Sequence, residues 1–119
     1  MISNTELKYL FKEKLDLSEW KKYSIKDDYA YGGVPIPGLR QEAYAIESEE
    51  TMISVGVFYY HDVLTYIAWG HKEAVHCAFH APVSAEGKIL EVRNGCPDVQ
   101  PTKVSGVVTG FALDGVMYT

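Results

Sequence analysis

The stretch that decides the fold is TMISVGVFYY (51–60), followed by His61-Asp62 and then by VLTYIAWG (63–70). From Ile53 to Tyr59 every second residue is apolar or aromatic, and this period of two is typical of a β-strand. The second run is rich in β-branched and aromatic residues, which also favour strands. Because only two residues separate the runs, the sequence predicts an antiparallel hairpin.

More strands are expected on both sides of this hairpin. They are predicted at QEAYAIES (41–48), KILEVR (88–93), VSGVVTGFAL (104–113) and VMYT (116–119). The stretches SAEG, NG and Asp114-Gly115 are turn sequences. Gly106 and Gly110 interrupt one predicted strand, where glycine often marks a bulge or a close backbone approach. The short gaps between the runs favour a meander of antiparallel strands.

The N-terminal segment has a different pattern. Ser3 and Glu6 form a capping box, and apolar residues recur at helical spacing, so a helix is predicted over 4–14. A second short helix is expected at 18–23, and residues 27–38 are expected to form an extended Gly/Pro loop. The predicted fold class is α+β, with one or two N-terminal helices packed on a mainly antiparallel sheet of five to seven strands. One domain, 1–119, is expected, divided into a helical segment (1–26), the loop (27–38) and the sheet (39–119).

Composition narrows the classes of function. The net charge is −5, and it arises after residue 26, because the first 26 residues carry six lysines against four acidic residues. An acidic body repels phosphate backbones, so nucleic-acid binding is not expected. The N-terminus MISNTELKYL has no apolar run typical of export, and no run could span a membrane. We therefore expect a cytoplasmic protein with Cys77 and Cys96 as reduced thiols; in an oxidising compartment the two could instead form a single disulfide.

The segment GHKEAVHCAFHAP (70–82) raises the question of a metal site. In a helix, His76 and His80 would lie on one face and could share a zinc ion. In a strand they would lie about 13 Å apart and could not. Residues 74–81 alternate without exception and end at Pro82, so the sequence favours a strand in which Cys77 is a small core residue.

His71 and Glu73 form the pattern H-x-E, which is similar to one half of the zinc-deaminase signature. The other half, P-C-x-x-C, is missing, because Cys96 stands alone and precedes Pro97. An alternative interpretation is nevertheless a small metal-dependent hydrolase or deaminase-like enzyme. It would use His71 and Glu73 as catalytic residues and hold zinc at His76 and His80.

The favoured interpretation is a non-enzymatic, acidic binding protein without a cofactor. It would be an inhibitor or immunity-type protein that captures a basic protein partner, or a protein that binds a small ligand. Exposed strand edges also make a homodimer reasonable. A third possibility is a pocket between the sheet and the N-terminal helix, lined by Trp20, Trp69 and tyrosines. The candidate binding residues are Asp27, Asp28, Tyr29 and Tyr31 in the Gly/Pro loop, Tyr59, Tyr60, His61 and Asp62 at the hairpin, and Trp69.

Overall fold

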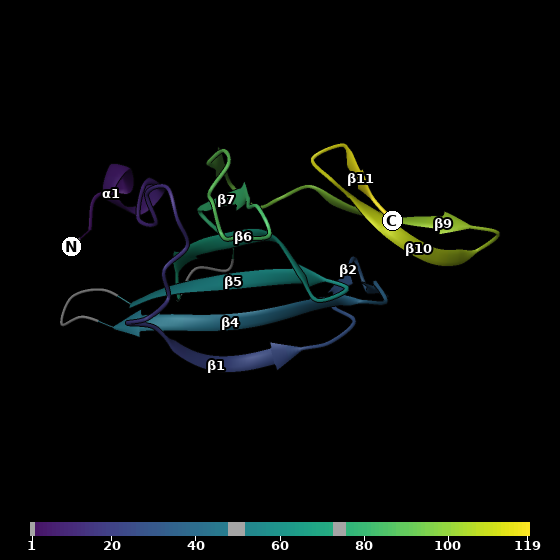
Figure 1. Cartoon of the computed structure of the whole chain (residues 1–119), viewed down its shortest axis with the longest axis horizontal. Helices are drawn as coiled ribbons and strands as arrows, with labels where there is room; N and C mark the ends of the chain where they lie inside the picture. Colours follow the sequence, from purple (N-terminus) through teal and green to yellow (C-terminus); the bar gives the residue numbers. More distant parts are fainter. Residues whose placement is uncertain (1, 48–51, 73–75) are drawn as a thin grey trace.

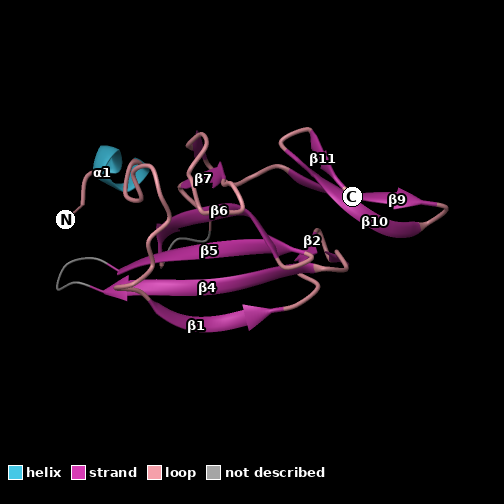
Figure 2. Cartoon of the chain, viewed as in Figure 1, coloured by secondary structure: helices cyan, strands magenta, loops and turns pink. Residues whose placement is uncertain are grey.

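The computed structural model describes residues 2–47, 52–72 and 76–119. In these ranges the chain forms one short helix, α1 (Asn4–Lys8), and eleven strands (Figure 2). The strands are β1 (Lys21–Lys26), β2 (Ala30–Tyr31), β3 (Val34–Pro35), β4 (Leu39–Glu47), β5 (Met52–Tyr60), β6 (Val63–His71), β7 (Phe79–Pro82), β8 (Arg93–Asn94), β9 (Val99–Val104), β10 (Val107–Leu113) and β11 (Val116–Tyr118). The predicted α+β fold class is therefore wrong, and the fold is mainly antiparallel β. Among the described residues, no helix is long and apolar enough to cross a membrane.

The strands form two main sheets and one small hairpin. Six strands make the larger sheet, in the order β1-β4-β5-β6-β7-β8, and every neighbouring pair is antiparallel. The smaller sheet has the order β11-β10-β9, and β2 pairs with β3. The molecule measures 50 × 24 × 23 Å, with α1 near one end and the smaller sheet at the other (Figure 1).

Two-residue turns with positive φ at both positions join several neighbouring strands. Such turns match the right-handed twist of the strands that they connect. The predicted turn at His61-Asp62 joins β5 to β6, and that at Asp114-Gly115 joins β10 to β11. Ser105-Gly106 is a further turn of this kind, so the predicted single strand at 104–113 is wrong. Gly110 follows a bulge in β10, and an added Cβ would collide with the Tyr118 carbonyl.

The first face of the larger sheet is covered by the N-terminal segment. Val55, Trp69 and Phe79 are direct neighbours in the register of β5, β6 and β7, so their side chains share this face. They are buried together with Leu7 and Phe11, and the Phe11 ring meets the Trp69 indole edge-on at 5.3 Å. This apolar cluster holds α1 and the following coil against the sheet.

The second face is covered along only part of its length. Phe58 and Tyr66 are paired across β5 and β6, and their rings stack with a centroid distance of 4.3 Å. They form a second apolar cluster with Phe111 and Leu113 of the smaller sheet. The cluster is completed by Ile36, Leu39, Tyr60 and Val99. Among the described residues, no comparable apolar cluster covers the rest of this face.

The N-terminal helix is shorter than predicted. The capping box between Ser3 and Glu6 is present, but α1 ends at Lys8. In a longer helix the Leu7 carbonyl would accept from the N–H of residue 11. Here it accepts instead from the Trp69 indole at 2.7 Å, and Lys12 has a φ of 55°. A tertiary contact therefore competes with the helical pattern.

The second predicted helix, at 18–23, is also wrong. Residues 21–26 form β1, which pairs antiparallel with β4 and has a bulge between Lys22 and Ser24. The backbone groups of β4 are available along this edge, and pairing satisfies donors and acceptors on both strands. Thus the segment 1–26 is not mainly helical.

Three further predicted segments differ from the structure. Within 27–38, β2 and β3 form a hairpin around Gly32-Gly33 instead of an extended loop. Residues 88–93 make two isolated bridges and the first residue of β8 instead of a continuous strand. The predicted strand at 74–81 begins only at Phe79; residues 76–78 are irregular, and 73–75 lie outside the described residues.

Candidate functional site

The uncovered half of the second face contains a groove with a floor of small residues. Ser24, Ala43, Gly56 and Ala68 are successive neighbours across β1, β4, β5 and β6, and therefore form one row. Ala45, Ser54 and Gly70 form the next row. Two adjacent rows without a large side chain leave a depression of about 440 Å³. This volume lies within the range of small-molecule sites.

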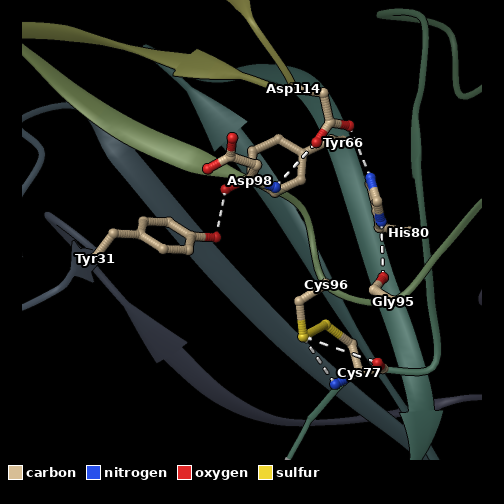
Figure 3. The surroundings of a disulfide bond; sticks show 8 residues. All are labelled: Tyr31, Tyr66, Cys77, His80, Gly95, Cys96, Asp98 and Asp114. Carbon is tan, nitrogen blue, oxygen red and sulfur yellow. Dashed lines mark hydrogen bonds and ion pairs between the residues drawn. A yellow bond between two sulfur atoms is a disulfide. The ribbon is translucent and has the colours of Figure 1, made fainter.

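One wall of the groove is aromatic. Tyr29 and Tyr31 come from the β2–β3 region and lie against Phe58, which begins the covered part of the face. The Tyr29 and Phe58 rings meet edge-on at 5.3 Å. The hydroxyls of Tyr31 and Tyr66 are 2.7 Å apart and hydrogen-bond each other (Figure 3). Burial raises the pKa of both phenols well above their ordinary value, so both stay uncharged and form an uncharged wall.

The charged residues of the groove stand at two margins of the floor. Lys26 comes from β1, while His71, Lys72 and His76 come from the end of β6 and the segment after it. Among the residues that the structure describes, no aspartate or glutamate lines the groove. Although the chain has a net charge of −5, the described side chains that line the groove are positive or neutral.

A disulfide bond between Cys77 and Cys96 closes one end of the groove. The expectation of two reduced thiols, with Cys77 as a core residue, is therefore wrong. The bond joins the segment before β7 to the loop after β8, where the Gly95 N–H also donates to the Ala78 carbonyl at 2.7 Å. In the disulfide, neither sulfur is a thiolate that could bind zinc.

His80 is buried, with 3% of its surface exposed, and both ring nitrogens are engaged (Figure 3). Nδ1 lies 2.7 Å from the Gly95 carbonyl, and Nε2 lies 2.8 Å from Asp114 Oδ2. Both partners are acceptors, so both contacts are hydrogen bonds only when each nitrogen carries a proton. No ring nitrogen is left for a metal or a substrate, and His80 connects two parts of the fold.

The Asp114 carboxylate accepts hydrogen bonds from three different residues. It accepts from His80, from Arg93 at 2.6 Å and from the backbone N–H of Asp98 at 2.9 Å. Burial alone would raise the pKa of the Asp114 carboxyl, but these hydrogen bonds outweigh it and hold the pKa below its ordinary value. The carboxylate therefore stays charged in a partly buried place.

The residues of the alternative enzyme interpretation do not converge. His76 is exposed and lines the groove, whereas His80 is buried in its own network. His71 ends β6, and Glu73 lies outside the described residues. In the described part of the chain, no three His, Cys, Asp or Glu side chains are arranged to hold a metal ion.

The predicted binding residues fall into two separate places. Tyr29 and Tyr31 line the groove. Tyr59, Tyr60, His61 and Asp62 lie at the β5–β6 hairpin outside it.

Internal contacts occupy the hairpin residues. Arg40 bonds Asp62 at 2.5 Å, and its guanidinium carbon lies 4.7 Å from the centroid of the Tyr59 ring. The Tyr60 hydroxyl donates to the Thr109 carbonyl at 3.4 Å. The His61 ring lies against Gly38, where an added Cβ would meet it. These contacts hold the hairpin side chains in place, and their role in binding stays a prediction.

The remaining predicted residues also lie away from the groove floor. Asp27 is exposed, and the Asp28 carboxylate accepts from the Gly38 N–H at 3.2 Å. Trp69 borders the groove, but its indole is 1% exposed and packs on the first face. Trp20 lines a different depression, of about 720 Å³, beside the N-terminal segment. That depression is lined by both lysine and acidic side chains, so its charges are mixed.

Several groove residues were not singled out from the sequence. Ser54 and Gly56 share one face of β5, but their alignment with Ala43 and Ala68 depends on the register of three strands. Tyr23 and Lys72 carried no motif. No family model, curated protein or solved structure matches the chain.

Proposed function

We propose that this protein is a non-catalytic binding protein that holds a small-molecule ligand in the groove on the second face of the larger sheet. The observation that carries this proposal is the row Ser24, Ala43, Gly56 and Ala68, which leaves half of a sheet face open beside an aromatic wall. Binding sites for small ligands are typically concave, with aromatic surface and a few polar groups.

The groove supports a small ligand better than a basic protein partner. Its described lining contains Lys26 and Lys72 but no carboxylate, and like charges would repel a basic surface. The inhibitor or immunity-type role expected from the net charge would therefore need a different surface.

The disulfide supports a function in an oxidising compartment. Disulfides persist outside the reducing cytoplasm and are rare within it. Because Cys77–Cys96 forms one end of the groove, we place ligand binding in such a compartment and not in the cytoplasm expected from the sequence.

The experiment follows backbone amide signals by NMR while an uncharged naphthalene carboxamide is added to the oxidised protein. We expect the shifts to concentrate at Ala43, Gly56 and Ala68. Ser54→Leu fills the floor and should weaken binding at least about tenfold, through loss of the contact volume. Thr109→Leu adds the same side chain on an exposed part of β10 and should leave binding unchanged.

Thermal unfolding of Ser54→Leu verifies that the variant is folded. Ser24→Leu, on the edge strand β1, fills the neighbouring row of the floor and is a second test. Shifts spread evenly over the chain, or binding that both filled variants retain, would contradict the proposed function.

A further inference from the structure

The charged residues of the groove indicate which class of ligand it accepts. This inference rests on the proposed function and concerns the same site. Lys26 lies on β1, and Lys72 follows the end of β6, so the two cations stand at opposite margins of the floor. His71 and His76 add side chains that are neutral or positive, and never negative.

Lys72 and Tyr23 approach each other across the groove. Tyr23 belongs to β1, whereas Lys72 follows β6, and β4 and β5 lie between these strands. Lys72 Nζ nevertheless lies 4.8 Å from the centroid of the Tyr23 ring. The two side chains therefore extend over the floor and form a cation–π pair above it.

A ligand with a carboxylate can replace this cation–π contact by a stronger interaction with Lys72. Both residues are exposed, and an exposed cation–π contact contributes only about 0.5–1 kcal/mol. A ligand carboxylate can form a charge-assisted hydrogen bond to the same ammonium, which is a stronger interaction. The Tyr23 ring would then be free to cover an aromatic ligand.

We propose that the groove is selective for an organic anion, namely an aromatic carboxylate. Its carboxylate pairs with Lys72 and is attracted by Lys26, and its ring lies on the small-residue floor against Tyr29 and Tyr31. The hydroxyl of Tyr31 is already bonded to Tyr66, so this wall offers aromatic surface and not a competing charge. A cationic ligand meets only like or neutral groups among the described lining residues.

The test compares a naphthalene carboxylate with its uncharged carboxamide on the oxidised full chain, by NMR titration at low and high salt. The carboxylate should bind about five- to tenfold more tightly at low salt, since each exposed pair contributes up to about 1 kcal/mol. High salt should reduce this preference, because exposed charges are screened. The carboxamide affinity should change little.

Lys72→Met should lower the carboxylate affinity about fivefold and change the carboxamide affinity less than that. Lys103→Met removes another exposed lysine, from β9 outside the groove, and should leave both affinities unchanged. Lys26→Met provides a second charge-removing variant.

The outcomes separate the two proposals. Equal binding of both compounds in the groove overturns the charge selectivity and leaves the proposed function standing. A preference for the carboxylate that survives both Lys72→Met and Lys26→Met also overturns it. A short acidic peptide that binds in the groove when the carboxylate does not overturns the small-ligand assignment. If no probe binds, the proposed function itself is overturned.

Discussion

The Nε2 atom of His80 lies 2.8 Å from the Asp114 carboxylate, and this hydrogen bond connects the larger sheet to the smaller one. His80 belongs to β7, whereas Asp114 occupies the turn between β10 and β11. Because His80 is buried, loss of this hydrogen bond would leave its Nε2 atom without a partner.

Replacing the carboxylate should therefore destabilise the fold. We expect Asp114→Asn to lower the free energy of unfolding by about 2 kcal/mol, because hydrogen bonds to charged groups contribute about 1.5–3 kcal/mol. Urea denaturation followed by circular dichroism measures the change. Asp98→Asn keeps the backbone N–H that donates to Asp114 and should cost less than about 0.5 kcal/mol. Equal stabilities of the two variants would contradict this role for Asp114.

Low pH should reduce the stability of the folded protein, because the carboxylates of Asp114 and Glu42 become protonated. Burial would raise the pKa of Glu42, but hydrogen bonds from Lys22, Tyr44 and Arg40 together hold it below its ordinary value of 4.5. The pKa of Asp114 is likewise below its ordinary value of 3.8.

A carboxyl with a lowered folded-state pKa contributes stability above its unfolded pKa, and loses it as pH falls through the folded pKa. Urea midpoints should therefore be steady near neutral pH and fall below about pH 4.5. The double variant Glu42→Gln/Asp114→Asn should show a shallower fall. An equally steep fall would show that other groups cause the acid sensitivity.

Reduction of the disulfide should destabilise the protein. The bond closes a loop with a sequence separation of 19, which corresponds to about 3 kcal/mol from restriction of the unfolded chain. Chemical denaturation with and without a reductant measures this difference, and a thiol assay verifies reduction. The double variant Cys77→Ser/Cys96→Ser should have the same free energy of unfolding as the reduced protein, and adding reductant should not change it. Two free thiols with unchanged stability would argue against this contribution.

Gly70 is required where the segment before β7 crosses the sheet. A Cβ at this position would lie 2.9 Å from the Ala78 backbone nitrogen, whose N–H donates to the Trp69 carbonyl. We expect Gly70→Ala to cost about 2 kcal/mol, since overpacking against backbone cannot relax freely. In Gly56→Ala the nearest atom is the flexible end of Gln41, at 3.0 Å, so the cost should be smaller. Thermal unfolding measures the loss of stability in both variants. Equal losses would contradict the close approach at Gly70.

Strand positions in the middle of the chain could be read from local pattern. The alternation in 52–60, the turn residues His61-Asp62 and the Asp114-Gly115 pair all lie where strands and turns form. These features depend on side-chain periodicity and on backbone conformations that few residue types adopt, so local sequence contains the necessary information.

The N-terminal segment and the His/Cys segment could not be settled in this way. Leu7 and Phe11 have helical spacing, but the Trp69 indole occupies the Leu7 carbonyl and the helix ends. Cys77 and Cys96 carried no spacing signal for a bond, and His80 gave no sign of its partners Gly95 and Asp114. Each outcome depends on a residue far away in the sequence.

The sequence by itself determined the β5–β6 hairpin, the turns at His61-Asp62 and Asp114-Gly115 and the alternation of faces along β5, because these follow from neighbours in the chain. Only the tertiary structure decided the groove. Ala43, Gly56 and Ala68 become one floor through the register of three strands, and the smaller sheet leaves that part of the face uncovered. The physical reason is that a shift of one residue in register turns every side chain of a strand to the other face.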